Sequence, residues 1–149
     1  MEQCTLCDPA RAPIIGESLS WQLVLSRNQN LLGNCFLVLR RHLEAVPQRT
    51  GCEWRELHEQ MAPATEMLAR AFEPDHFNYA FLQNLDRHVH LHVIPRYAAP
   101  RTFAGLTFED RDYRAHYTVP APAHHLTSEK YAALAVRLRQ LLAEARAKR

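Results

Sequence analysis

One stretch of the sequence reads Arg87-His88-Val89-His90-Leu91-His92-Val93-Ile94. Imidazole and aliphatic side chains alternate along it, and in a β-strand alternate side chains share a face. The pattern therefore predicts a strand over 87–94, with three histidines on one face and three aliphatic residues on the other. Because aliphatic side chains are usually buried, the histidine face is the one expected to be available for chemistry.

Three histidines on one strand face have two natural uses. They can bind one metal ion together, as in catalytic zinc sites, or they can surround a phosphate with one histidine acting as the nucleophile. Residues i and i+4 of a strand are about 13 Å apart at their roots, so His88 and His92 could share a metal with His90 only if the strand bends strongly. Both uses stay open, and His90, which has both neighbours within reach, is the best placed for the reaction centre.

Further strands are predicted around this stretch. Apolar runs at Trp21–Leu25 and Cys35–Leu39 are typical of buried strands, and Phe77–Leu82 is a third candidate. Only Gln83–Asp86 separates that last run from the histidine strand, so the two strands are expected to pair antiparallel. Pro95 is expected to end the histidine strand.

Two helices are predicted from their capping residues and apolar spacing. Thr50-Gly51-Cys52-Glu53 has the form of a capping box, and the helix that it starts contains Pro63, where we expect a kink or a break. Thr127 or Ser128 would cap a second helix near the C-terminus. The fold class is therefore α+β, with an antiparallel sheet of about five strands and two or three helices.

The domain organisation follows from length and pattern. The chain has 149 residues, of which 47% are hydrophobic and 23% charged, so it is expected to form a single globular domain over 1–149 rather than a disordered chain or a coiled coil. Its parts are a core at 1–96, an irregular arm at 97–125 and a C-terminal helix at 126–149. A long irregular segment of this kind is usually functional or packs on a partner.

Charge and hydropathy narrow the possible partners. The net charge of +2 is too small to predict a nucleic-acid or membrane partner. The longest apolar run, Cys35–Leu39, is too short to cross a bilayer, and no apolar stretch of signal-peptide length follows Met1. A cytoplasmic protein is therefore expected.

Two of the four cysteines form a C-x-x-C motif at Cys4 and Cys7. This spacing lets two thiolates bind one metal ion, or lets the two thiols close to a disulfide. The alternative is a pair of exposed thiols without a ligand. The motif alone does not decide among these interpretations.

The histidine stretch resembles the H-φ-H-φ-H-φ-φ signature of the histidine triad (HIT) superfamily, where φ is apolar. Phe36–His42 is similar to the apolar strand, basic pair and histidine that precede the triad in that family, and Cys4-x-x-Cys7 is similar to the N-terminal motif of its zinc-containing members. The resemblance extends from Cys4 to about Arg96. It implies a HIT-like fold and a nucleotide hydrolase related to dinucleoside polyphosphate hydrolases and adenylate-amide hydrolases.

The resemblance also implies roles for the triad, His88, His90 and His92. His90 would be the nucleophile that attacks the α-phosphorus and forms a nucleotidyl-histidine, which water then hydrolyses. His92 would donate a hydrogen bond to the phosphate or to the leaving group. A nucleotidyltransferase or a phosphorylase would use the same intermediate, so these activities are alternatives.

In zinc-containing members of the family the first histidine of the triad is a zinc ligand. The resemblance therefore implies a closed structural Zn²⁺ site made by Cys4, Cys7, His42 and His88. Small HIT proteins form homodimers, so a homodimer that takes a nucleotide substrate is expected.

The sequence departs from the family where many members carry a Gly-Gln-Ser or Gly-Gln-Thr segment that holds the phosphates. Here the link reads Asn84-Leu85-Asp86-Arg87. Asn84 matches an asparagine found at this point in several members, and Arg87 is our candidate for the missing phosphate contact, since a guanidinium binds phosphate through two parallel hydrogen bonds. Asn28 is the candidate for the ribose side. The departure favours an alternative function, a non-catalytic or slow nucleotide-binding module.

Overall fold

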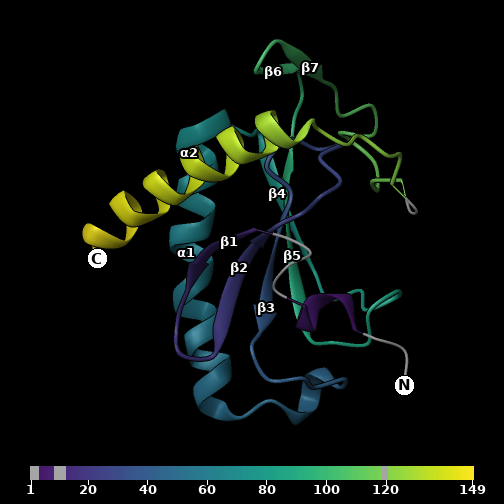
Figure 1. Ribbon diagram of the computed structural model, residues 1–149. Helices are drawn as coiled ribbons and strands as arrows, with labels where there is room; N and C mark the ends of the chain where they lie inside the picture. The colour runs from purple at the N-terminus through teal and green to yellow at the C-terminus, as the bar shows by residue number, and fades with distance from the viewer. Residues whose placement is uncertain (1–3, 9–12, 119–120) are drawn as a thin grey trace.

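A computed structural model describes residues 4–8, 13–118 and 121–149 of the chain (Figure 1). Its strands are β1 (Ile14–Glu17), β2 (Trp21–Leu25), β3 (Cys35–Leu39), β4 (His76–Ala80), β5 (His90–Arg96), β6 (Arg101–Phe103) and β7 (Leu106–Phe108). Its helices are the 3₁₀ turns η1 (Thr5–Cys7) and η2 (Val46–Gln48) and the α-helices α1 (Gly51–Phe72) and α2 (Ser128–Ala147). Within the described residues, no helix has both the length and the apolar character needed to span a membrane.

Strands β1 to β5 form one antiparallel sheet in the order β1-β2-β3-β5-β4, and β6 and β7 form a separate hairpin. The α+β fold with a five-stranded antiparallel sheet and two α-helices is therefore confirmed. Strand β5 lies between β3 and β4, with His92 opposite Phe36 and His90 opposite Val38. The histidine strand is thus a central strand, supported on both sides.

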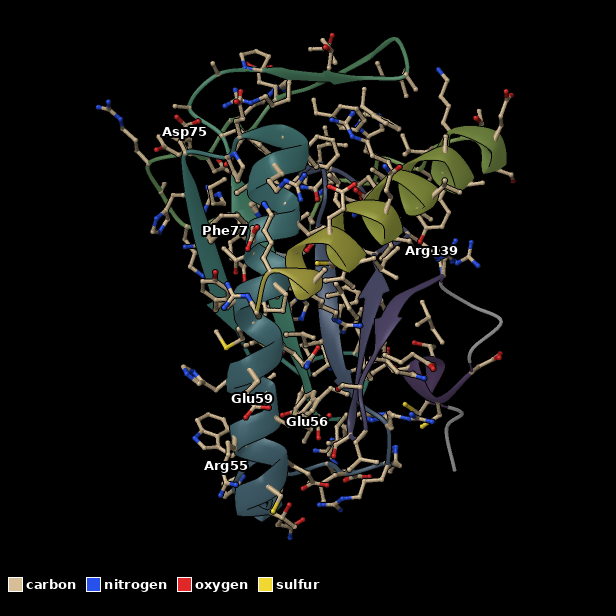
Figure 2. All side chains as sticks on the ribbon, turned by 90° about the vertical axis from the view of Figure 1, so that its left-hand side faces the viewer. Arg55, Glu56, Glu59, Asp75, Phe77 and Arg139 are labelled. Atoms are coloured by element: carbon tan, nitrogen blue, oxygen red, sulfur yellow. The ribbon has the colours of Figure 1, made fainter. Side chains whose placement is uncertain are left out.

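Both α-helices cover one face of the sheet, while η1 and the segment after β7 lie on the other side (Figure 1). Figure 2 views the molecule from the helix side, where Arg55, Glu56 and Glu59 mark the lower half of α1. The core lies between the helices and the sheet, and the aliphatic residues of the histidine stretch belong to it, as predicted. Its largest fully buried side chains include Trp21, Leu23, Leu25, Leu37, Leu39, Leu57, Met67, Leu68 and Leu134.

Helix α1 begins with the predicted capping box. The Thr50 hydroxyl accepts from the backbone N–H of Glu53 at 3.2 Å, and the Glu53 carboxylate accepts from the Thr50 N–H at 2.7 Å. The break predicted at Pro63 does not occur, because the helix continues from Gly51 to Phe72. Pro63 is buried, and the apolar residues before and after it pack into the same core, which holds the helix together despite the missing N–H donor.

The boundaries of the histidine strand also differ from the prediction. Regular pairing begins at His90 instead of residue 87, and it continues through Pro95 to Arg96. Proline is tolerated there because the pairing of β5 with β3 ends at Val93, so Pro95 has a strand partner, Phe77, on one side only. The sequence patterns also missed β1, a short edge strand, and they left the β6–β7 hairpin inside the irregular arm.

Candidate functional site

His90 begins β5, and it is 6% exposed. Its Nδ1 lies 2.7 Å from the backbone carbonyl oxygen of His88. Because a carbonyl oxygen can only accept, Nδ1 carries the ring proton and Nε2 keeps its lone pair. The backbone thus fixes the tautomer that a nucleophilic imidazole needs.

His92 follows on the same face of β5, and its Nε2 lies 3.0 Å from Nε2 of His90. Since the His90 nitrogen is the acceptor, the His92 Nε2–H is the donor. Phe36 of β3 packs edge-on against both rings, with centroid distances of 5.6 Å to His90 and 4.7 Å to His92. The two imidazoles are therefore held in one defined arrangement by a hydrogen bond and an aromatic neighbour.

Burial keeps both imidazoles neutral. Desolvation lowers the pKa of His92 to about 4, and the nearby His90 adds to this effect. Desolvation also lowers the pKa of His90, although its hydrogen bond to the His88 carbonyl and the negative charge of Asp86 act in the opposite direction. At neutral pH the pair is uncharged, which preserves the lone pair on His90.

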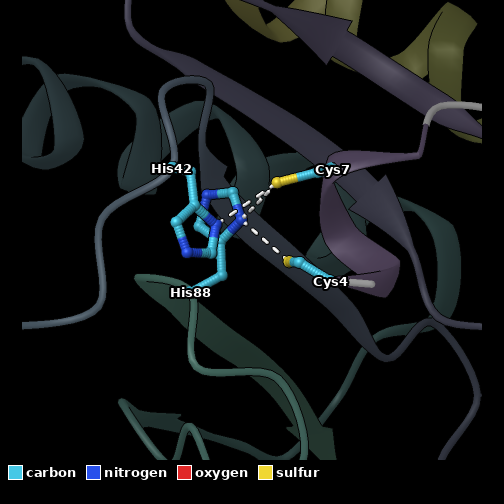
Figure 3. Close-up of side chains that lie close together, drawn as sticks. All are labelled: Cys4, Cys7, His42 and His88. Carbon is cyan, nitrogen blue, oxygen red and sulfur yellow. Dashed lines mark hydrogen bonds between the residues drawn. The ribbon is translucent and has the colours of Figure 1, made fainter. Parts of the chain in front are cut away.

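Four residues far apart in the sequence converge beside the start of β5 (Figure 3). Cys4 and Cys7 come from the N-terminal turn η1, His42 follows β3, and His88 precedes β5. Their potential ligand atoms all lie within 4.8 Å of one another. Among the described residues, this is the single group of three or more Cys, His, Asp or Glu side chains with such a geometry. The predicted ligand set is thus brought together, and the two thiols are not isolated.

The geometry of this cluster fits a tetrahedral metal ion. The Cys4 Sγ and Cys7 Sγ each lie 3.3 Å from His88 Nδ1, and Cys7 Sγ lies 3.4 Å from His42 Nδ1. Zn–S and Zn–N bonds of ordinary length in a tetrahedron place sulfur and nitrogen ligands about 3.6 Å apart. A Cys₂His₂ set is also the donor set of structural zinc sites, so the residues fit the ion that the sequence suggested.

Protonation in the cluster is consistent with a metal site. His88 Nε2 lies 2.6 Å from the carbonyl oxygen of Leu39, to which it must donate, so its Nδ1 is unprotonated and faces the cysteines. Burial and the neighbouring Cys4 raise the pKa of the Cys7 thiol to about 11. The thiol is therefore protonated at neutral pH in the absence of a metal, and metal binding would release its proton.

His88 does not share the strand face predicted for it. It lies before β5, it is fully buried, and its ring contacts the cysteines and Leu39 instead of His90. The cause is that regular pairing begins only at His90, so the alternation of side chains does not extend back to His88. The three histidines therefore separate into His88, which belongs to the Cys/His cluster, and the hydrogen-bonded pair of His90 and His92.

A cavity of about 430 Å³ lies over the His90–His92 pair. It is bounded by the sheet, by the turn between β2 and β3, by the link before β5, by η1 and by the segment after β7. Its lining residues are Leu6, Ser26, Asn28, Asn30, Leu31, Asn34, Phe36, Leu82, Asn84, Leu85, Asp86, His90, His92, Ile94, Tyr117, Thr118 and Ala121. Most of this surface is apolar, with a smaller number of polar side chains, which is the usual composition of a small-molecule site.

No family model and no curated protein matches the sequence. Solved structures do match. A hypothetical histidine triad nucleotide-binding protein of Sulfolobus tokodaii superposes with a TM-score of 0.76 at 16% identity, covering 95% of this chain and 93% of that one. A histidine triad protein of Marinobacter aquaeolei gives a TM-score of 0.73 at 22% identity, covering 91% and 92%. The protein has the histidine triad fold.

The histidine triad fold includes relatives with metal. A zinc-bound histidine triad family protein of Mycobacterium smegmatis matches with a TM-score of 0.65 at 16% identity, covering 99% of this chain and 98% of that one. The match extends over the N-terminal turn and α2 as well as the sheet. The whole chain is therefore comparable with solved histidine triad structures, including the arm and C-terminal helix that lay beyond the resemblance seen in the sequence.

The three predicted substrate-binding residues lie in different places around the histidine triad cavity. Asn28 lines it, but its side chain is already engaged, since its Oδ1 accepts from the N–H of His124 at 2.9 Å and its Nδ2 donates to the Pro122 carbonyl at 3.1 Å. Asn84 lines the cavity and is exposed. Arg87 is exposed and is not among the lining residues. Asn28 thus holds the later part of the arm against the β2–β3 turn.

Sequence reasoning missed one contact at this site. Asp86, in the link before the triad, accepts from the backbone N–H of Thr5 at 2.7 Å and from its hydroxyl at 2.5 Å. Asp86 and Leu6 both line the cavity, so the N-terminal turn forms part of its wall. The only signal in the sequence was the carboxylate in the segment that replaces Gly-Gln-Ser, and nothing local connected it with Thr5.

Proposed function

We propose that the protein is a zinc-containing member of the histidine triad family that cleaves nucleotides at the α-phosphate. The substrate class is a dinucleoside polyphosphate or a nucleoside phosphoramidate. The observation that carries the proposal is the unprotonated Nε2 of His90, which lines the cavity 3.0 Å from Nε2 of His92. A neutral imidazole in a partly apolar cavity is a suitable nucleophile for phosphorus.

In the proposed reaction the lone pair of His90 Nε2 attacks the α-phosphorus, and the bond from phosphorus to the leaving group breaks. The His92 Nε2–H, which donates to His90 in the free protein, turns to a phosphate oxygen or to the leaving atom. The hydrogen bond from His90 Nδ1 to the His88 carbonyl stabilises the positive charge that forms on the ring. Water then attacks phosphorus, releases the nucleoside monophosphate and regenerates His90.

The metal cluster is proposed to bind structural Zn²⁺ through Cys4, Cys7, His42 and His88. Bound there, the ion would link η1 to His88, two residues before β5 begins, and thereby fix the start of the proposed catalytic strand. Because His88 is turned toward the cysteines, we do not favour the alternative in which all three histidines bind a catalytic zinc.

Phosphate contacts are proposed to come from the link before β5. Asn84 lines the cavity in that link, and Arg87 ends the link. Arg87 is proposed to turn to the phosphates when substrate binds, since its side chain is exposed.

A homodimer is also proposed. Strand β4 is an edge of the sheet and Tyr79 on it is 40% exposed, so a second copy could pair along that edge.

The experiment is incubation with diadenosine polyphosphate or adenosine phosphoramidate, followed by intact-protein mass spectrometry after a rapid quench. We expect product formation and an adenylate adduct that maps to His90, and His90→Ala is expected to lose both. Full activity in His90→Ala would refute the mechanism.

A second candidate, a non-catalytic nucleotide-binding module, is favoured by the missing Gly-Gln-Ser segment. Nucleotide binding without product formation after long incubation would select this candidate.

A further inference from the structure

Arg96, the last residue of β5, is a buried arginine with a full set of partners. It is 2% exposed, and its guanidinium forms a two-point ion pair with the Asp110 carboxylate, with Nε–Oδ2 at 2.6 Å and a second contact to Oδ1 at 3.1 Å. A further N–H donates to the Asn78 side-chain oxygen on β4 at 2.7 Å. The charge is thus fully paired inside the protein, as a buried charge must be.

The same guanidinium binds the backbone of the arm. It donates to the carbonyl oxygens of Asp112 at 2.5 Å and of Ala115 at 3.2 and 3.3 Å. Arg96 therefore holds a stretch of irregular chain, residues 110–115, against the end of the triad strand. Irregular chain has no internal hydrogen-bond ladder, so its position depends on contacts of this kind.

That stretch leads directly to the cavity wall. Thr118 donates from its backbone N–H at 3.2 Å and from its hydroxyl at 2.5 Å to the Asp112 carboxylate. Tyr117 lies beside it, with its ring centroid 5.8 Å from the guanidinium carbon of Arg96. Both Tyr117 and Thr118 line the cavity over the histidine pair. A chain of direct contacts thus connects Arg96 with this wall.

The wall lies at a defined end of the cavity. Alternate residues of β5 share one face, and neighbours on that face are about 6.6 Å apart along the strand. On the cavity face these residues are, in order, His90, His92, Ile94 and Arg96. The wall is therefore near Ile94, whereas the link residues Asn84–Asp86 precede His90. At this end the aromatic ring of Tyr117 and the side chain of Thr118 line the cavity together with Ile94, which is chemistry suited to a nucleoside rather than to phosphates.

We propose that Arg96 is a positioning residue that, through Asp110 and the carbonyls of Asp112 and Ala115, holds Tyr117 and Thr118 as the nucleoside wall of the cavity. The proposal rests on the proposed nucleotide function and deepens it, because it assigns the arm to the nucleoside end of the site. Arg96 touches no reacting atom, so its replacement should weaken nucleoside binding without changing the chemical step.

The test compares Arg96→Lys with a matched control, Arg101→Lys. Arg101 also donates to backbone carbonyls, of Phe72 and Glu73, and to an aspartate, Asp75, but it lies away from the cavity. Binding of the four nucleoside monophosphates, and of inorganic phosphate as the probe without a nucleoside, is measured by calorimetry. We expect Arg96→Lys to lose about tenfold or more in affinity for nucleoside monophosphates, while its affinity for phosphate stays that of the wild type and Arg101→Lys keeps both.

A second variant covers the case in which Arg96→Lys does not fold. Asp112→Ala leaves the buried Arg96–Asp110 pair intact and removes the contacts to Thr118, and it should show the same selective loss. Its control is Asp75→Ala, which removes a carboxylate that accepts a backbone N–H, that of Ala98 at 2.8 Å, and that does not line the cavity. Nucleotide binding by Asp112→Ala equal to that of its control would overturn the inference while leaving the proposed function intact. A wild type that binds none of the four nucleotides would overturn both.

For the wild type and the Arg96→Lys variant, hydrolysis of a dinucleoside polyphosphate gives an independent readout. We expect KM to rise with kcat and the pH profile unchanged, since His90 and His92 keep their contacts. A lowered melting temperature with an unchanged KM would mean that Arg96 only stabilises the fold, and would overturn its role at the wall.

Discussion

The carboxylate of Asp86 accepts two hydrogen bonds from Thr5, one from its backbone N–H and one from its hydroxyl, although the two residues are 81 positions apart. Thr5 lies in the turn that carries Cys4 and Cys7, and Asp86 lies in the link that lines the cavity. The turn that carries the two cysteines of the Cys/His cluster and the link that lines the cavity are therefore joined by two hydrogen bonds. Loading of the metal should influence the cavity wall, and the wall should influence metal affinity.

Thr5→Val tests this connection, because valine has the shape of threonine without the hydroxyl. Loss of one hydrogen bond at an exposed site, where water can replace it, costs about 0.7–1.4 kcal/mol, so zinc affinity should fall about three- to tenfold. Thr65→Val is the matched control, since it also loses hydroxyl contacts, to Met61 and Tyr79, but remote from the cluster. Zinc affinity is measured by competition with a metal-binding dye, and equal affinities in the two variants would contradict the prediction.

Removal of zinc should destabilise the fold. Binding of zinc to a site that is absent in the unfolded chain contributes directly to the folding free energy. Chelation is therefore expected to lower the free energy of unfolding by several kcal/mol, which is about 4 kcal/mol if the free zinc concentration had been a thousand times Kd. Urea unfolding with and without chelator measures this. Metal analysis gives the residue control. Cys4→Ala should lose zinc, whereas His90→Ala should retain it, and the reverse order would favour a zinc site made by the three histidines.

Sequence patterns correctly predicted those strands and helix starts that depend on neighbouring residues in the chain. The strands at Trp21–Leu25 and Cys35–Leu39, the capping box at Thr50 and the cap at Thr127 are all confirmed. Each depends on side-chain alternation or on a hydrogen bond within three residues of the chain. The sequence also brought Cys4, Cys7, His42 and His88 into one predicted ligand set, through the resemblance to a family.

What the sequence did not reveal depends on contacts between distant segments. Alternation extended the histidine strand to Arg87, but pairing with β3 begins only at His90 and pairing with β4 only at His92. The arm looked irregular because it is held by Arg96 and Asn28, each of which belongs to a different strand or turn. No periodic sequence pattern predicts such contacts, because the backbone of the arm is bound by a few side chains from elsewhere in the chain and not by a regular hydrogen-bond ladder.

The Glu53 carboxylate should make stability depend on pH in acid. Hydrogen bonds from Arg41 and Thr50 lower its pKa to about 2, against an ordinary value of 4.5. A lowered pKa means that the ionised form stabilises the fold above the unfolded pKa, and that this contribution is lost as pH falls from 4.5 toward 2. In Glu53→Gln, which can keep the capping hydrogen bond but not the charge, this part of the pH dependence should disappear.

The control for that measurement is Glu129→Gln, since Glu129 also lies in the first turn of its helix but is exposed and makes no side-chain hydrogen bond among the described residues. Urea midpoints are recorded between pH 5 and pH 2. As the pH falls from 5 to 2, the urea midpoints of the wild type and of Glu129→Gln should decrease in parallel. The midpoint of Glu53→Gln should be lower at pH 5 and should decrease less. Parallel decline in all three would show that Glu53 does not contribute as expected.

A side chain at Gly33, in the turn between β2 and β3, should destabilise the fold. Its φ of 87° lies in the left-handed region, and a Cβ there would be 2.8 Å from Leu68 Cδ2 and 3.2 Å from the ring of Phe72. Gly105 has a similar φ of 76°, but a Cβ there would have no neighbouring atom within 4 Å. Gly105→Ala therefore measures the cost of the positive φ alone, without crowding. Crowding a packed core costs about 1–3 kcal/mol, and Gly33→Ala should be less stable than Gly105→Ala by that amount. Because the turn contains Asn34 and leads directly into Phe36 of β3, both of which line the cavity, Gly33→Ala should also weaken nucleotide binding. Equal unfolding free energies in the two variants would exclude the crowding.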